Sequence, residues 1–230
     1  MKEICVKKGF VVGIIILFLT IGFSPIINAD GNTIPQAIGD VPITIIECKA
    51  DGTVERTVFR MSREQADSFY EEMRNAQDLD TRLSIYKKYN LISQDITVDS
   101  LQAGMEERAR GMGLTQDDLM SQFRSNQSLF PPFVRRNIFC YVTGGEAVWN
   151  GFCFPPITGV TGWVRHIGLF FFITGCSIET LGLLGTFYLE CLFVKLVGFV
   201  GIIRTGSHNN WRAIGYEGFC VYTKALGTPD

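Results

Sequence analysis

The chain has few of the residues and motifs from which active sites are usually assembled. Its 230 residues include two histidines and no C-x-x-C pair, so a zinc ribbon or a thioredoxin-like site has no local support. Neither G-x-x-x-x-G-K nor a G-x-G-x-x-G that opens a helix is present, which leaves out the common phosphate-binding loops. The sequence therefore indicates no catalytic group, no metal site and no cofactor.

An excess of positive charge is also lacking. The 21 Lys and Arg residues are balanced by 23 Asp and Glu residues, which gives no electrostatic case for a nucleic-acid partner. No fixed-period repeat occurs, so collagen, coiled-coil and solenoid architectures are excluded. With 47% hydrophobic residues, the chain is unlike a disordered protein and is long enough to bury a sizeable core.

The N-terminus has the pattern of an export leader. Three lysines precede an uncharged apolar run over residues 9–23, and a small residue, Ala29, stands before Asp30. This pattern predicts a secretory signal peptide cleaved between Ala29 and Asp30. The alternative is an uncleaved signal anchor, because residues 9–27 are just long enough to span a bilayer. Both predict an extracellular or cell-surface protein, with membrane or cell-envelope association possible.

Cysteine usage agrees with export. Six cysteines remain after residue 29, namely Cys48, Cys140, Cys153, Cys176, Cys191 and Cys220. An even number in an exported chain favours disulfides, although six cysteines allow 15 pairings. Cys140 and Cys220 lie in the first and last apolar runs of the second half, which a closed sheet brings together. We therefore expect a disulfide between these two, with buried free thiols as the alternative.

Asn126 begins a sequon and is a glycosylation candidate.

Two regions of different character follow the leader. From residue 47 to 136, 28 of 90 residues are charged, whereas from 137 to 230 only 10 of 94 are charged and 15 are glycine. Pro131 and Pro132 mark the boundary, since a proline pair cannot continue a helix. The predicted organisation is a leader over 1–29, a charged α+β region over 30–136 and a glycine- and aromatic-rich β domain over 137–230.

The charged region predicts a β-hairpin and several helices. Residues 43–48 and 54–60 are rich in β-branched side chains and are joined through an Asp-Gly turn. Apolar residues at spacings of three and four then indicate amphipathic helices. The expected helix starts are Ser62 with Gln65 as a capping box, the segment that opens at Leu79, Asp99 as a cap, and Thr115 with Asp118 as a second box.

The second region predicts strands. Aromatic and β-branched runs occupy residues 138–142, 147–154, 163–174, 181–193, 196–203 and 212–222, and glycines or prolines separate them. The expected fold class is α+β, with an N-terminal β-hairpin plus helices and a C-terminal antiparallel β sandwich or barrel. A membrane-inserted segment over 167–203 is the rival, but Glu179, Glu190 and Lys195 interrupt it.

Some of these segments resemble known sequences. The leader, the charged α+β segment and the strand start Asn137-Ile138-Phe139-Cys140 resemble a group of uncharacterised exported archaeal proteins. The stretches 197–201 and 214–219 look like the closing strands of that group. The resemblance covers about the last 90 residues of the chain and implies no activity.

Several side chains of the second region are candidates for chemistry. His166 reads as a strand residue and His208 as a turn residue. Glu146, Glu179, Glu190 and Glu217 are the glutamates of the second region, and two facing carboxylates would suit glycoside hydrolysis. The residues of a possible aromatic platform for a sugar or a peptide are Trp149, Trp163, Trp211, Tyr141, Tyr188, Tyr216 and Tyr222.

The sequence thus favours a non-enzymatic exported or envelope-attached binding or structural module. An extracellular hydrolase that uses C-terminal glutamates and a membrane-inserted protein are the alternatives.

Overall fold

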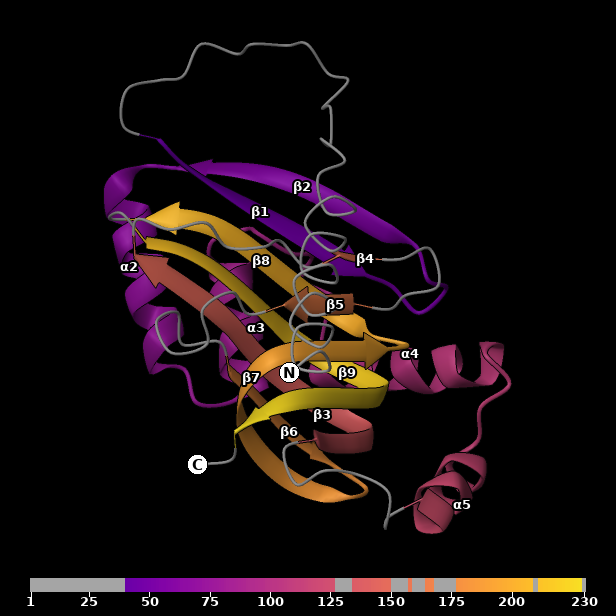
Figure 1. The fold of residues 1–230 in the computed structure, drawn as a ribbon. Helices are drawn as coiled ribbons and strands as arrows, with labels where there is room; N and C mark the ends of the chain where they lie inside the picture. Colours follow the sequence, from indigo (N-terminus) through magenta and orange to yellow (C-terminus); the bar gives the residue numbers. More distant parts are fainter. Residues whose placement is uncertain are drawn as a thin grey trace, which may run out of the picture. The chain divides into compact units, whose positions relative to one another are not determined.

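The computed structural model describes residues 40–126, 134–149, 157–158, 164–167, 177–208 and 211–228. Its elements, in chain order, are β1 (Val41–Cys48), β2 (Val54–Met61), α2 (Arg63–Asn75), α3 (Leu79–Lys88), α4 (Val98–Gly111), α5 (Gln116–Asn126), β3 (Val134–Trp149), β4 (Ile157–Thr158), β5 (Val164–Ile167), β6 (Ser177–Gly182), β7 (Gly185–Val197), β8 (Val200–His208) and β9 (Trp211–Thr228) (Figure 1). The leader, with Ala29 and Asp30, lies outside the described residues.

The predicted hairpin and the first predicted helix are confirmed. β1 and β2 pair antiparallel, and Gly52 supplies the positive φ of 87° that their turn requires. Ser62 caps α2 with Gln65 in the predicted capping box, in which each side chain accepts from the other residue's backbone N–H. Local sequence chemistry determines these elements, because each depends on residues within a few positions of one another.

The third helix begins two residues earlier than expected. Thr97 caps α4, because its hydroxyl accepts from the Ser100 N–H at 3.1 Å while the Ser100 hydroxyl accepts from the Thr97 N–H at 2.8 Å. Asp99 lies in the first turn, where the helix dipole stabilises its negative charge. At the fourth helix, the Thr115 hydroxyl accepts from the Asp118 N–H at 3.1 Å, as predicted, and donates to the Asp118 carboxylate at 2.6 Å.

Several strand boundaries differ from the prediction; residues 196–203, expected as one strand, span the end of β7 and the start of β8. Gly144 and Gly145, expected to form a turn, lie inside β3, where both remain paired with β6 and β9. Residues 181–193, expected as one strand, contain the β6–β7 turn at Leu183 and Leu184. Buried Asn137 holds this turn, since its side chain donates to Gly185 O at 2.8 Å and accepts from Leu184 N–H at 3.1 Å. A tertiary hydrogen bond therefore sets the turn.

One antiparallel sheet unites the two regions of different composition. Its order is β2-β1-β8-β9-β3-β6-β7-β5-β4, and β9 also pairs with β7. β1 pairs with β8, and residues 38–230 form one compact unit. The pairings β9–β3, β3–β6, β6–β7 and β7–β9 close a ring of four strands, the closed form of the two predicted alternatives. The α+β fold class is confirmed.

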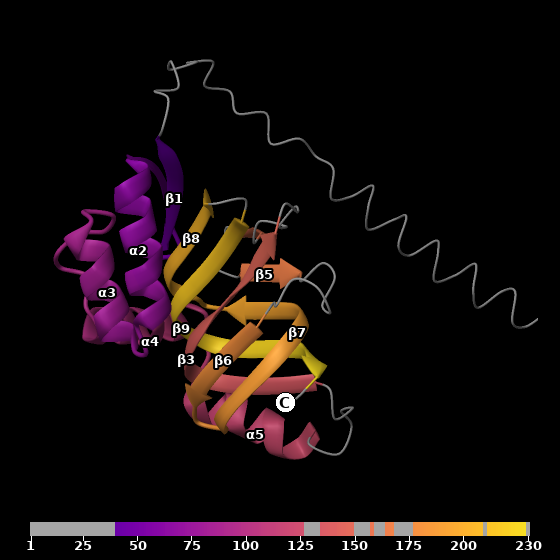
Figure 2. The ribbon, with the colours of Figure 1, turned by 90° about the vertical axis from the view of Figure 1, so that its left-hand side faces the viewer.

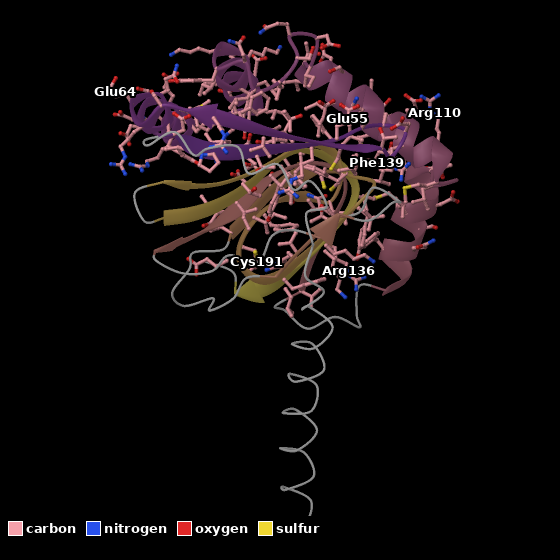
Figure 3. All side chains as sticks on the ribbon, turned by 90° about the horizontal axis from the view of Figure 1, so that it is seen from above. Glu55, Glu64, Arg110, Arg136, Phe139 and Cys191 are labelled. Carbon is pink, nitrogen blue, oxygen red and sulfur yellow. The ribbon has the colours of Figure 1, made fainter. Side chains whose placement is uncertain are left out.

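The helices cover only part of the sheet. Figure 2 shows α2, α3 and α4 on one side of β1, β8 and β9. One hydrophobic cluster joins these helices to the strands, through residues such as Phe69, Leu83 and Ile202. A second cluster contains Leu189, Cys191 and side chains of β3 and β9, and Figure 3 labels Cys191 within the sheet.

Within the described part of the chain, no helix has the length and apolar character needed to cross a membrane.

Candidate functional site

Glu217 of β9 is buried in the layer between helices and sheet. Its side chain is 1% exposed, and its Oε1 accepts a hydrogen bond from Arg82 Nη1 of α3 at 2.9 Å. Arg82 also donates through Nη2 to Ala76 O at 3.2 Å. Glu179 and Glu190, by contrast, are exposed on β6 and β7, and the Glu146 side chain lies outside the described set. Glu217 is therefore the sequence candidate that the fold places in a built environment.

A second arginine and two tyrosines complete this network. The Arg204 guanidinium of β8 lies 5.4 Å from the centre of the Phe69 ring and 5.2 Å from that of Tyr70. Tyr86 of α3 is fully buried near Glu217 and Arg204, and burial, reinforced by the Glu217 carboxylate, raises the pKa of its hydroxyl. The Glu217 Oε2 atom has no hydrogen-bond partner among the described residues. The network thus surrounds a fully buried carboxylate with two arginines, of which Arg82 is 23% exposed.

This arrangement suits a structural role, the positioning of α3 on the sheet, rather than a catalytic one. An ion pair with one fully buried partner contributes little net stability, but removing either partner destabilises the protein. Gly215 makes room for the network, since a Cβ there would lie 3.1 Å from Arg204 Nη2. Because the helices cover Glu217 and Arg82 engages it, we assign the network to docking α3 on the sheet.

Where helix cover ends, the same sheet face carries a band of mixed side chains. We call this band the outer face; it consists of Tyr141 and Thr143 of β3, Glu179 and Leu181 of β6, and Tyr188 of β7. Leu181 and Tyr188 are 60% and 46% exposed. Glu179 is exposed, whereas Tyr141 and Thr143 are half-buried. The outer face thus offers aromatic, aliphatic, hydroxyl and carboxylate groups together.

Strand register brings these five residues together. Tyr141 pairs with Leu181, Thr143 with Glu179, and Glu179 with Tyr188. Directly paired residues in an antiparallel sheet project to the same side, and successive strands lie about 4.8 Å apart. The five side chains therefore form one continuous surface across three strands.

The outer face adjoins the buried network. Tyr141 contacts Phe219 with ring centroids 5.9 Å apart, and Phe219 packs against the helix-facing core. Burial raises the pKa of Tyr141, which also lies within electrostatic reach of Arg82 and of the Glu217 and Glu179 carboxylates. Tyr141 consequently marks the line between the covered and the uncovered parts of the sheet.

The other predicted aromatic residues have different places. Tyr216 is fully buried in the second cluster, and Tyr222 packs against Phe123 of α5 with ring centroids 5.7 Å apart. Trp149 and Trp211 occupy paired positions in β3 and β9, and Trp163 lies outside the described residues. Only Tyr141 and Tyr188, among the seven platform candidates, contribute described side chains to the outer face.

The two histidines and the sequon asparagine belong to three different elements. His166 lies in β5, as predicted, whereas His208 is the last residue of β8 rather than part of a turn. Asn126 is the last residue of α5, and the rest of its sequon lies outside the described residues. Within the ranges that the structure describes, no three His, Cys, Asp or Glu side chains are placed to hold a metal ion.

The described cysteines are all buried. Cys48, Cys140 and Cys220 form no disulfide among the described residues, while Cys153 and Cys176 lie outside them. The predicted adjacency of the first and last strands of the second region is confirmed, because β3 pairs with β9 and Cys140 faces Cys220 directly. Their sulfur atoms are 3.4 Å apart and unbonded. The pair was predictable from the sequence, whereas Thr223, whose hydroxyl contacts both sulfurs, was not.

Arg82, Thr143 and Arg204 were not among the candidates that the sequence indicated. A detectable signal existed for Arg204, because it is a charged residue in an otherwise apolar strand and so must find a partner or reach water. Thr143 carried no such signal, since its importance depends on its strand neighbours.

Comparison with known proteins adds no assignment. No protein-family model matches the chain, and neither curated proteins nor solved structures gave a match. Its function must be argued from its own geometry.

Proposed function

We propose that the protein is an exported, non-enzymatic binding module that holds an extended neutral polysaccharide on the outer face. The observation that carries this proposal is the juxtaposition of Tyr141, Leu181 and Tyr188 with Thr143 and Glu179 across three paired strands. The predicted export leader would bring the protein into contact with such polymers outside the cell.

The chemistry of the outer face suits a sugar chain. A sugar ring has an apolar C–H face that packs on aromatic rings, and tyrosine offers a rigid apolar body with a polar tip. Sugar hydroxyls donate to carboxylates and exchange hydrogen bonds with other hydroxyls, roles open to Glu179 and Thr143. Because these groups line an open strand face, an extended polymer fits them better than a compact ligand does.

A hydrolase is the second candidate, and one observation favours it. Glu179 and Glu217 both pair with Thr143, from opposite sides, so their backbones are two strand spacings, or about 10 Å, apart. Inverting glycosidases hold two carboxyl groups at a comparable separation. Against this role, Glu217 is buried and engaged by Arg82. Binding without cleavage therefore remains the function we favour.

Binding of soluble neutral polysaccharides, measured by affinity electrophoresis and calorimetry, tests the proposal. We expect Tyr188→Ala and Tyr141→Ala each to weaken binding by about tenfold or more, the equivalent of about 1.4 kcal/mol. Val58→Ala is the matched control, since Val58 is 56% exposed on β2, away from the outer face; it should bind like the parent protein.

Four results would overturn this proposal. The first is the absence of binding across the polysaccharide panel, and the second is unchanged binding by Tyr188→Ala. The third is release of new reducing ends by the parent protein but not by Glu179→Gln, which would establish the hydrolase. Preferential capture of peptides by the outer face would likewise replace the sugar ligand.

A further inference from the structure

Cys140, Cys220 and Thr223 form a triangle of contacts inside the ring of four strands. The two sulfur atoms are 3.4 Å apart, and the Thr223 hydroxyl lies 2.7 Å from the Cys220 sulfur and 3.3 Å from the Cys140 sulfur. All three residues are 0% exposed. Two thiols and a hydroxyl thus satisfy one another in a site closed to water.

The backbone geometry of the two cysteines suits a covalent bond. They are directly paired across β3 and β9, and paired residues in an antiparallel ladder have Cα atoms about 4.5–5.5 Å apart. Disulfides accept Cα separations of about 4.4–6.8 Å. The Cα separation expected for a directly paired position therefore lies within the range that a disulfide requires.

We propose that Cys140 and Cys220 are a redox couple that locks the strand ring, and that Thr223 is the positioning residue of its reduced state. In the oxidation, the two thiols give up two protons and two electrons to a small-molecule disulfide such as oxidised glutathione. That disulfide becomes two thiols, and one sulfur–sulfur bond forms between Cys140 and Cys220. The inference is independent of what the outer face binds.

The two cysteines react with an external disulfide or thiol only when the strand ring opens. Burial, first, and the neighbouring Cys140 thiol both raise the pKa of Cys220, so the reactive thiolate is scarce in the folded protein. The bond is consequently formed during folding or local opening. Once formed, the disulfide closes a loop of 80 residues that includes β6, β7 and β8. Because it is buried, it also resists reduction by an external thiol.

Thr223 gives the proposal a second, independent test. Its hydroxyl bonds the thiols in the reduced state, and a disulfide sulfur is a poorer partner than a thiol. Thr223→Val removes a bond that the reduced state makes and the oxidised state lacks. We expect this variant to reach half-oxidation at a roughly two- to tenfold less oxidising glutathione ratio, the range of one ordinary hydrogen bond.

The experiment is refolding of the reduced full chain in glutathione buffers of graded ratio, followed by acid quenching and peptide mapping without reductant. A peptide linking Cys140 to Cys220 is expected, lighter by two hydrogen atoms than the two free peptides combined. Cys140→Ala should abolish it, whereas Cys48→Ala should preserve it, because Cys48 lies on β1 outside the ring. Thr57→Val, on the exposed edge strand β2, should leave the half-oxidation ratio unchanged.

Two outcomes would overturn the inference. Recovery of Cys140 and Cys220 on unlinked peptides at the most oxidising ratio, or linked to other cysteines, would remove the couple. A half-oxidation ratio for Thr223→Val equal to that of the parent protein would remove the role of Thr223. Should Thr223→Val fail to refold, Thr223→Ser, which keeps the hydroxyl, must behave like the parent for the role to stand.

Discussion

Glu217 accepts a hydrogen bond from Arg82 at 2.9 Å, although 135 residues separate them in the sequence. Arg82 belongs to the charged region and Glu217 to the glycine-rich region, so this one contact joins the two parts of different composition. It fastens α3 to β9 and lies next to Tyr141, where helix cover ends. The contact thus fixes the inner boundary of the outer face.

Glu217→Gln should lower the free energy of unfolding by about 3 kcal/mol. The substitution leaves Arg82 and Arg204 without their buried counter-charge, a change that typically costs 3–5 kcal/mol for a buried pair; Arg82, at 23% exposed, can partly reach water. Urea unfolding measures the change. Glu179→Gln is the matched control, because Glu179 also pairs with Thr143 but is exposed; it should change stability by less than about 0.5 kcal/mol. Equal effects of the two substitutions would contradict the assignment.

The protein should lose stability at alkaline pH. Burial raises the pKa of Cys48 from 9.0 to about 12, and it also raises the pKa of Tyr86 above its ordinary value of 10.0. The unfolded chain therefore releases protons above about pH 9 that the folded chain retains, and stability falls as the pH rises. Each such group contributes a slope of about 1.4 kcal/mol per pH unit.

Urea unfolding at about pH 8 and about pH 11 checks this dependence. Cys48 and Tyr86 should leave the free energy of unfolding unchanged below about pH 8.5 and should lower it above that pH. Cys48→Ala removes one of the groups, so its stability should decline less steeply. A variant whose slope equals that of the parent protein would show that Cys48 does not contribute.

Thr97→Ala should destabilise the protein by about 1 kcal/mol. The substitution removes the side-chain acceptor for the Ser100 N–H and breaks the reciprocal cap of α4. Asp99→Ala is the matched control, since Asp99 contributes only its charge near the helix N-terminus, worth about 0.3–1 kcal/mol. Thermal unfolding of the two variants separates them, and a larger loss for Asp99→Ala would restore the cap that the sequence suggested.

Local patterns in the sequence determined much of the fold. The hairpin of β1 and β2, the Ser62 cap and the four helices depend on turn chemistry and on apolar spacing within a few residues. The antiparallel character of the second region and the adjacency of Cys140 and Cys220 also followed from the order of apolar runs. The hairpin, the cap and the helices were predictable because short-range interactions are sufficient to specify them, whereas the Cys140–Cys220 adjacency was expected from the way a closed sheet joins its first and last strands.

Only the tertiary structure decided the pairing of strands and the fate of single polar side chains. β1 extends the sheet through β8, the β6–β7 turn depends on Asn137, and Gly144 stays within a strand. Of the four glutamates of the second region, Glu217 is buried and pairs with Arg82, whereas Glu179 and Glu190 are exposed. The side chain of the fourth, Glu146, lies outside the described set. The physical reason is register: a residue's face and neighbours depend on which distant strand lies beside it, and no local pattern carries that information.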